Sequence, residues 1–296
     1  MKDLFNCRLS PGTLATIFRE CAHEMVEPLL LIKEGLRKAA VLNVDETNLR
    51  VQQKQAWVHV SATDQLTLLV HDQRRGTAAI EELGILAGYK GVAVHDGFTA
   101  YDQYRQCRHS LCNAHILREL NYVIETSKPD WATAIKKLLL EIKAAVSKAG
   151  AGGKERLAVR QKQEFLDRYD RIVLAAGKLS EPLQRKKGPA KTRRPKESPM
   201  MAGARQLVNM LGAKRDEILL LMSDFKVPFD NNQAERDLRM LKVKQKVSGC
   251  FRTPRGAAEW CRVRSYVTTM KKQGHSLMET IKSVSAGKVL MPALRC

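Results

Sequence analysis

The N-terminal part of the chain has its apolar residues at helical spacing. Leu14, Ile17, Phe18 and Cys21 recur three or four positions apart, and the stretch that begins at Ser10 contains helix-starting residues. Apolar positions between 29 and 36 continue the same period. We therefore expect a helical lead-in over residues 1–39, whose role is packing rather than chemistry.

The period changes from helical to strand-like at Ala40. Short apolar runs, one with clean alternation, precede a helical segment that Gly88 closes, and a further apolar run follows. The predicted elements are strands at 40–45, 56–60 and 67–71, a helix at 77–87 and a strand at 91–96.

Two of these predicted strands end in an aspartate, Asp45 in the first and Asp96 in the last. Short connections favour antiparallel hairpins among the first three strands, and the helical crossover favours a parallel pairing of the fourth strand with the first. Both acids would then lie at one edge of the sheet. Carboxylates this close repel one another unless a cation lies between them, and Mg²⁺ prefers carboxylate oxygens. Either acid by itself is equally consistent with a structural role, so it is the pair that indicates a metal site.

Four other acids in this region are assigned structural positions. Glu46 directly follows Asp45 on the same strand, where successive side chains point to opposite faces, so only one of the two can face the site. Asp64 and Asp72 fall in turns or at strand ends, and Asp102 follows a turn.

A cluster of cysteines and histidines follows the second aspartate. Its spacing, from Cys107 and His109 to Cys112 and His115, invites a zinc interpretation, although structural zinc sites usually have a wider gap between ligand pairs. The favoured alternative is a short strand at 111–112, with His115 at the start of a helix that runs to position 125. His115 would then face the acidic residues as a positioning group.

The middle of the chain is predicted to be helical, with one basic interruption. Helices are expected at 131–148 and 154–176, separated by a glycine-rich stretch, and again at 204–222. Residues 177–204 mix lysine, arginine and proline, which is typical of a loop or linker. Such a segment is equally consistent with contacts to phosphates and with a solvated surface loop.

The stretch from Pro228 to Gly249 is predicted to contain an amphipathic helix. Ala234, Leu238 and Leu241 form an apolar stripe, and a second stripe consists of one acid followed by three cations. The members of that second stripe are Glu235, Arg239, Lys242 and Lys246.

Two interpretations of the polar stripe are open from the residues alone. In the first, Asn232 caps the helix and Glu235 completes a capping box. In the second, Glu235 is a metal ligand and the cations hold a phosphate backbone. Two further helices are expected at 256–272 and 276–285.

Composition narrows the class of partner. The chain has 296 residues with 51 Lys and Arg against 31 Asp and Glu, a formal charge of +20 that suggests nucleic acid, if only through counterion release. The odd number of cysteines, 7, does not resemble a secreted disulfide framework. A signal peptide and a membrane-spanning apolar run are both missing from the pattern, so we expect a cytoplasmic, nucleoid-associated protein with reduced thiols and no membrane partner.

Four local sequences together resemble the transposases of the insertion-sequence 66 family, over roughly residues 10–285. They occur in the family's order, which makes the likeness specific although each alone is weak. The motifs are Val44-Asp-Glu-Thr47, His95-Asp-Gly-Phe-Thr-Ala-Tyr101, Leu111-Cys-Asn-Ala-His115 with Arg118-Glu-Leu120, and Asp230-Asn-Asn-Gln-Ala-Glu-Arg-Asp-Leu-Arg239.

The resemblance implies an α/β fold. It is a ribonuclease H-like mixed sheet with a mainly helical insertion between the second and third catalytic acids and with helical ends. The corresponding segments are the lead-in at 1–39, the first part of the core at 40–125, the insertion at 126–222 with its basic linker at 177–204, and the third-acid helix with C-terminal helices at 223–296.

The resemblance also implies the chemistry. Asp45, Asp96 and Glu235 would be the DDE set that binds Mg²⁺, or Mn²⁺ in its place, for DNA cleavage and strand transfer at transposon ends. Expected partners are the transposon ends, target DNA and further copies of the chain in a homo-oligomer. The positions expected to contact DNA are Arg239, Lys242, Lys244 and Lys246. The positions expected to support the acids are Cys112, His115, Asn231 and Asn232.

Two departures from the family pattern suggest alternatives. Only 44 residues precede Asp45, without the cysteine pairs of the family's end-recognition region, so accessory proteins would supply recognition or the chain would be a truncated or repurposed copy that only binds DNA. Lysines stand where the family tends to have arginines after Glu235, which removes bidentate phosphate contacts. A structure-selective nuclease on the same core is the other alternative.

Overall fold

The computed structural model describes residues 9–180 and 199–294, which divide into two compact units. Residues 1–108 and 231–296 belong to the first unit, and residues 109–230 belong to the second. The three acids of interest, at positions 45, 96 and 235, therefore all lie in the first unit, although a whole second unit separates two of them in sequence.

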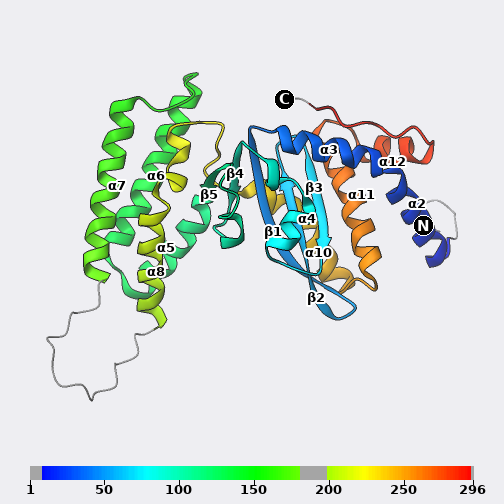
Figure 1. The fold of residues 1–296 in the computed structure, drawn as a ribbon, viewed down its shortest axis with the longest axis horizontal. Helices are drawn as coiled ribbons and strands as arrows, with labels where there is room; N and C mark the ends of the chain where they lie inside the picture. Colours follow the sequence, from blue (N-terminus) through cyan, green and yellow to red (C-terminus); the bar gives the residue numbers. More distant parts are fainter. Residues whose placement is uncertain (1–8, 181–198, 295–296) are drawn as a thin grey trace, which may run out of the picture. The chain divides into compact units, whose positions relative to one another are not determined.

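A five-stranded mixed sheet forms the centre of the first unit (Figure 1). β1 pairs antiparallel with β2, β2 pairs antiparallel with β3, and β4 runs parallel to β1, so the predicted parallel neighbour is confirmed. The strand order is β3-β2-β1-β4-β5, and β5 begins at the last residue of this unit. The strands are β1 Val41–Val51, β2 Lys54–Ala62, β3 Thr67–Asp72, β4 Val92–His95 and β5 Arg108–Leu111.

β1 is much longer than the prediction that ended it at Asp45. Its pairing with β2 continues to Val51 opposite Lys54, and residues 48–51 alternate between exposed and buried. A strand that is buried on one face only has polar residues at every second position. The sequence prediction ended this strand at Asp45, whereas Asp45 lies within β1.

Helices cover both faces of this sheet (Figure 1). Leu42 and Val44 of β1 pack in a core with residues of α3 and α4, whereas Leu49 and Val51 pack in a core with residues of α10 and α11. Even and odd positions of β1 thus face different helical layers, as strand geometry requires. The helices of this unit are α2 Pro11–Glu24, α3 Val26–Lys38, α4 Thr77–Leu83, α10 Asn232–Ser248, α11 Pro254–Lys272 and α12 Leu277–Ser285, with 3-10 turns η1 Leu86–Gly88 and η2 Thr99–Tyr101.

Local capping explains several helix ends. Ser10 accepts a hydrogen bond from the backbone N–H of Thr13 and so starts α2, and Ser276 forms a capping box with Glu279 at the start of α12. The helix predicted at 77–87 is shorter than expected because Gly84 takes a left-handed conformation with φ 64° and ends α4.

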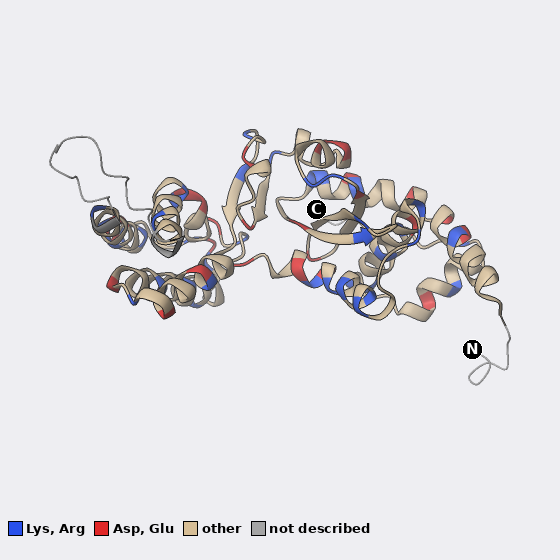
Figure 2. Cartoon of the chain, turned by 90° about the horizontal axis from the view of Figure 1, so that it is seen from below, with Lys and Arg blue, Asp and Glu red and all other residues tan. Residues whose placement is uncertain are grey.

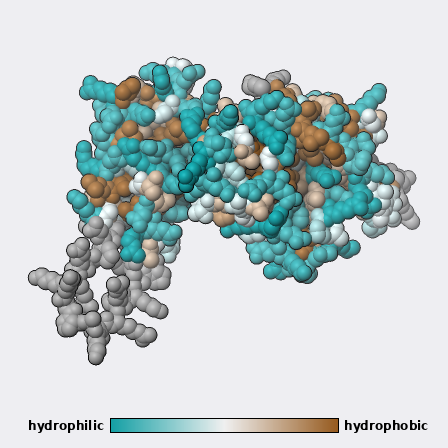
Figure 3. Space-filling view, in the orientation of Figure 1, coloured by the Kyte–Doolittle hydropathy of each residue, from teal (hydrophilic) through white to brown (hydrophobic). Residues whose placement is uncertain are grey.

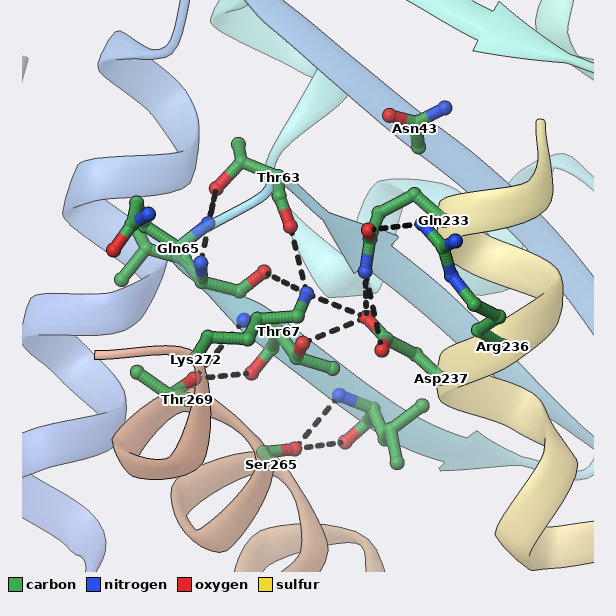
Figure 4. A network of polar contacts seen from close by, with 12 residues as sticks. Asn43, Thr63, Gln65, Thr67, Gln233, Arg236, Asp237, Ser265, Thr269 and Lys272 are labelled. Atoms are coloured by element: carbon green, nitrogen blue, oxygen red, sulfur yellow. Dashed lines mark hydrogen bonds and ion pairs between the residues drawn. The ribbon is translucent and has the colours of Figure 1, made fainter. Parts of the chain in front are cut away.

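The free edge of β3 is covered by polar side chains of α11 (Figure 4). Ser265 accepts a hydrogen bond from the N–H of Leu69 at 2.8 Å, and Thr269 accepts one from the N–H of Thr67 at 3.0 Å. An uncovered edge strand exposes unpaired backbone groups to other chains. The helix thus satisfies the backbone of the edge strand and closes that side of the sheet.

A buried ion pair next to this edge joins α10 to α11. The side chains of Asp237 and Lys272 are only 7% and 12% exposed, and the Nζ of Lys272 lies 2.7 Å from Oδ2 of Asp237. Lys272 also donates to the carbonyls of Thr63 and Leu66, and Thr67 donates to Asp237 at 2.7 Å (Figure 4). Burial lowers the pKa of Lys272, and the carboxylate of Asp237 opposes that shift.

An apolar groove of about 490 Å³ lies on another side of this unit, between α2, α11 and α12. Its lining includes Ile17, Trp260, Val267 and Ile281. Apolar surface is also visible over α11 and α12 in Figure 3. This side of the unit is therefore apolar, whereas the exposed surface of α10 is basic.

The second unit is helical. Its core includes Trp131, Leu138 and Leu207, and the hydroxyl of Tyr169 donates to the carbonyl of Leu211 at 2.9 Å. Asn113 is buried and donates to the carbonyl of Ile218 at 3.1 Å. The helices are α5 Asn113–Ser127, α6 Asp130–Ala151, α7 Val159–Ser180, α8 Pro199–Ala213 and α9 Arg215–Ile218, with the 3-10 turn η3 Leu220–Met222.

Some predicted boundaries in this unit are wrong. The helix expected from position 154 begins at Val159, because the N–H of the buried Leu157 donates to the carbonyl of Met222 and holds that segment outside the helix. The helix expected at 204–222 is divided into α8, α9 and η3, which turns Leu221 and Met222 into the core. The basic linker is narrower than 177–204, since α7 reaches Ser180 and α8 begins at Pro199. Its remaining part, 181–198, lies outside the described residues.

Within the stretches 9–180 and 199–294, none of the helices has the length and apolar character needed to cross a membrane.

We expect the loss of one partner of the buried Asp237–Lys272 pair to destabilise the first unit. Replacing Asp237 by Asn leaves a buried ammonium without its counter-charge, which costs about 3–5 kcal/mol. Chemical denaturation should show this loss in the free energy of unfolding. The matched control is Glu34→Gln, which breaks the exposed pair with Lys38 and should leave the free energy of unfolding close to that of the wild type. Equal effects of the two substitutions would contradict the prediction.

Candidate active site

The register between β1 and β4 brings the two aspartates to neighbouring positions. Val41, Leu42 and Asn43 pair in parallel with Val92, Ala93 and Val94. Continuing this register by two residues along each strand places position 45 beside position 96. The parallel pairing was predicted from the crossover helix, and its register now gives the aspartates their proximity.

Asp96 follows directly after β4, at the start of a tight turn. Its Oδ1 accepts a hydrogen bond from the N–H of Phe98 at 2.9 Å, and Nδ1 of His95 accepts one from the N–H of Gly97 at 3.1 Å. Gly97 has φ 98°, a conformation that favours glycine. These hydrogen bonds fix the backbone conformation of Asp96 directly after the end of β4.

Asn231 attaches the start of α10 to β1. This side chain is fully buried, accepts a hydrogen bond from Nδ2 of Asn43 at 2.9 Å and donates one to the carbonyl of Val44 at 2.9 Å. The N–H of Glu235 then donates to the carbonyl of Asn231 at 3.3 Å as the helix begins. Glu235 is therefore positioned next to a side chain that binds β1 at Asn43 and Val44, the two residues before Asp45.

The prediction that Asn232 caps this helix is wrong. The capping position is Asn231, and its side chain makes no capping hydrogen bond because it binds β1 instead. Asn232 is the first residue of α10. The capping-box explanation for Glu235 therefore loses its basis, while the apolar stripe of Ala234, Leu238 and Leu241 is buried as predicted.

Asp45 experiences the field of both other acids. Burial, and after it the negative charges of Asp96, Glu46 and Glu235, together raise its pKa to about 7, against a hydrogen bond from the N–H of Glu46 that lowers it. These electrostatic interactions identify Asp45, Asp96 and Glu235 as one acidic cluster. Among the described residues, their carboxylate oxygens do not all lie within 4.8 Å of one another.

This cluster fits a hard divalent cation by the chemistry of its donors. The three carboxylates offer only oxygen, which Mg²⁺ and Mn²⁺ bind in preference to softer ligands. A partly buried carboxylate with a raised pKa also gains from a nearby positive charge, which restores its charged form.

Glu46 has a different role, as predicted from strand alternation. Its side chain is 1% exposed, pairs with Arg75 at 2.9 Å and accepts a hydrogen bond from the hydroxyl of Tyr101 at 2.8 Å. The guanidinium of Arg75 also lies over the rings of Trp57 and Phe98. Sequence reasoning did not find Arg75, since no local pattern indicates that a basic residue after β3 neutralises an acid on β1.

The four basic residues of α10 that were predicted to contact DNA are not equivalent. Lys and Arg recur along this helix after an acid in its first turn (Figure 2). Arg239 and Lys246 are exposed, whereas Lys244 is half-buried, with its Nζ 3.8 Å from the ring centre of Phe251. Lys242 donates to the carbonyl and side-chain oxygen of Asn48 at 3.2 and 3.1 Å. Lys242 also interacts electrostatically with Asp45, which places it beside the acidic cluster.

In the part of the chain that the structure describes, the four cysteines and histidines of the predicted cluster do not form one group of metal ligands. Cys107 is buried and its thiol donates to the carbonyl of Tyr104 at 3.2 Å, so this residue has a structural role. Cys112 precedes α5, and the N–H of His115 donates to its carbonyl at 3.1 Å. Cys112 and His115 belong to the second unit, and their role at the acidic cluster stays a prediction.

Comparison with known proteins assigns the class of protein that this fold and cluster define. A family model described as transposase IS66 family matches residues 1–259. The chain therefore belongs to the IS66 transposase family, which identifies a DNA-processing enzyme of transposition. A search of the curated proteins finds no match.

The raised pKa of Asp45 predicts a pH-dependent stability of the metal-free protein. Because the folded state holds this proton more tightly than the unfolded chain, the stabilisation is complete below pH 4 and is lost as the pH rises through about 7. Asp45→Asn should remove this loss, so that its advantage over the wild type grows from pH 4 to pH 8, up to about 4 kcal/mol.

Denaturation in the presence of a chelator measures this difference. The matched control is Asp216→Asn, whose side chain is 92% exposed and which should not change the pH profile. A constant difference between wild type and Asp45→Asn at every pH would contradict the prediction.

Proposed function

We propose that the chain is a DDE transposase with a ribonuclease H-like core, which cleaves DNA at insertion-sequence ends and joins those ends to target DNA. The carrying observation is that Asp45, Asp96 and Glu235 form one acidic cluster in a member of a transposase family. The parallel β1–β4 pair inside a sheet that otherwise begins with two hairpins supports the proposed core.

Asp45, Asp96 and Glu235 would hold the divalent cations, Mg²⁺ or Mn²⁺. When bound, these ions supply activation of the attacking oxygen and stabilisation of the leaving one. Asp45 must lose its proton to act as a ligand, and with a pKa of about 7 it does so near neutral pH. The exposed cations of α10 would hold the DNA backbone against this cluster.

The reaction then has two displacements at phosphorus. Water attacks a phosphodiester at the transposon end, the bond to the 3′ oxygen breaks, and a free 3′-hydroxyl results. That hydroxyl attacks a phosphodiester of target DNA, forms the new bond and releases a 3′-hydroxyl on the target strand. The cluster serves both steps, and a covalent bond between protein and DNA is not required.

The remaining partners and supporting residues belong to the same proposal. Asn231 holds Glu235 in place through β1, and Asn232, Cys112 and His115 would support the acids or the DNA next to them. Joining two ends to one target calls for at least two copies of the chain, and accessory proteins would contribute end recognition. The cytoplasm, at the nucleoid, is where such a protein meets its DNA.

Substitution of the acids tests the proposal directly. Asp96→Asn, Asp45→Ala and Glu235→Ala should each abolish Mg²⁺-dependent nicking of supercoiled plasmid, because each removes a proposed ligand. DNA binding should persist. The matched control is Asp102→Asn, next to the same turn but outside the cluster, which should nick like wild type.

Each other outcome has a definite meaning. Unimpaired nicking by Asp96→Asn would refute the assignment. A folded wild type that binds DNA but never nicks plasmid or the element's own ends would identify a binding copy without catalysis. Cleavage of branched DNA without joining of a 3′-hydroxyl end to plasmid would identify a structure-selective nuclease.

Substitutions of the basic residues of α10 should have two different effects, one on the salt dependence of DNA binding and one on thermal stability. Replacing Arg239 or Lys246 by Ala removes an exposed charge, so the dependence of log affinity on log salt should become shallower by about one per residue. Lys244→Ala should instead lower the melting temperature through the lost contact with Phe251 and leave the salt dependence close to that of wild type. A salt slope reduced equally by all three would show that Lys244 also contacts phosphate.

A further inference from the structure

A polar groove of about 780 Å³ lies at the far end of the β1–β2 hairpin, against the last turns of α10. Its walls include Asn48, Arg50, Gln53 and Gln55 from the hairpin and Gln245 from α10. Four of these five side chains are amides, and in the described residues the lining contains no carboxylate. The proposed function uses none of the five directly.

The groove begins five residues beyond the last pair of β1 with β4, while the pairing of β1 with β2 continues to Val51. The pairing of β1 with β4 ends at Asn43, and farther along the carbonyl of Asn48 accepts hydrogen bonds from Lys242 and from Gln245, at 3.2 and 3.0 Å. Lys242 is also the cation that interacts with Asp45. Lys242 therefore interacts both with Asp45 and with Asn48, the first groove residue along β1.

The lengths of two elements, β1 and α10, give the separation between the acidic cluster and the groove. From Asp45 to Arg50, a strand rising about 3.3 Å per residue covers about 16 Å. From Glu235 to Gln245, a helix rising 1.5 Å per residue covers about 15 Å. A DNA strand that runs from the acids into the groove would therefore reach it about four to five nucleotides away, at about 3.4 Å per nucleotide.

The groove side chains suit bases better than phosphates. A phosphate only accepts hydrogen bonds, so it can bind the NH2 group of a side-chain amide but not its carbonyl oxygen. A base edge offers donors and acceptors together and can bind both groups. Within residues 9–180 and 199–294, no hydrogen bond or ion pair involves the side chains of Arg50, Gln53 or Gln55. Gln245 has donated to Asn48 and keeps its carbonyl oxygen as an acceptor.

The turn of the hairpin is built in an unfavourable conformation. Gln52 and Gln53 both have positive φ, 51° and 65°, in a two-residue turn that normally prefers Asn-Gly. The N–H of Gln52 donates to the carbonyl of Phe251 at 2.9 Å, and the N–H of Phe251 donates to the carbonyl of Arg50 at 2.9 Å. These bonds hold the turn, and of its two residues only Gln53 lines the groove.

We propose that this groove binds the DNA strand flanking the scissile phosphate and reads its base edges through Gln53, Gln55 and Arg50. The inference rests on the proposed function, since it takes DNA as the substrate of the acidic cluster. It adds a sequence preference about four to five nucleotides from the cleavage point, carried by the catalytic unit itself.

The test selects DNA with the full-length protein, without divalent metal, from a library of short duplexes of random sequence. The wild type should enrich a base preference over a few adjacent positions. Gln53→Gly and Gln55→Ala should each flatten that preference by roughly five- to a hundredfold at one position, the discrimination of one good base contact. The salt dependence should remain that of the wild type, because no charge is removed.

Gln52→Gly is the matched control. Glycine relieves the positive φ at either turn position, so both glycine variants should melt at or above the wild-type temperature, and misfolding would not explain a lost preference. Of the two glycine variants, only Gln53→Gly should change the base preference of the selected DNA. Equal effects of the two variants would assign the change to the turn backbone and overturn the role of the Gln53 side chain.

The remaining outcomes separate this inference from the proposed function. Preferences unchanged in both Gln53→Gly and Gln55→Ala, or a wild type without any preference, overturn base reading even if the protein nicks DNA. A preference that depends on Gln53 and Gln55 in a protein that never nicks DNA supports the groove and refutes the catalytic proposal, because selection without metal does not require cleavage.

Discussion

The arrangement of the first unit depends on where the parallel pairing of β1 with β4 stops. The last pair, Asn43 with Val94, comes two residues before Asp45 and Asp96. Up to that point the strands satisfy each other's backbone, and beyond it the free edge of β1 is available to other elements. The acids therefore lie at the boundary between a closed sheet and an open edge, where carboxylates keep access to solvent, cations and a ligand.

Helix α10 packs on one face of β1 and β2 and binds β1 on both sides of Asp45 along the strand. Asn231 binds β1 just before the acids, and Lys242 and Gln245 bind the carbonyl of Asn48 just after them. The buried ion pair of Asp237 and Lys272 joins α10 to α11. Because the helix is fixed along its length, Glu235 is carried on a rigid element, which a preorganised site requires.

Strand alternation keeps two sets of charges apart. Asp45 lies on the face of β1 that packs toward α10, while Glu46 lies on the opposite face and is neutralised by Arg75. Adjacent acids on one strand thus serve different purposes, one with a raised pKa in the cluster and one with a fixed partner. The same alternation continues to the hairpin turn and distributes exposed polar residues along the last part of β1.

Sequence by itself determined the elements whose signals are local. The crossover helix between two acid-tipped runs implied a parallel pair, the stripe of Ala234, Leu238 and Leu241 implied the buried face of α10, and alternation separated Asp45 from Glu46. Tertiary structure decided what depends on distant partners. β1 extends past Asp45 because β2 pairs with it, Asn231 serves β1 instead of capping α10, and Lys244 packs on Phe251 whereas Arg239 stays exposed. Such contacts leave no periodic trace, because a hydrogen bond or a ring contact between residues far apart in the chain is fixed only by how the elements pack.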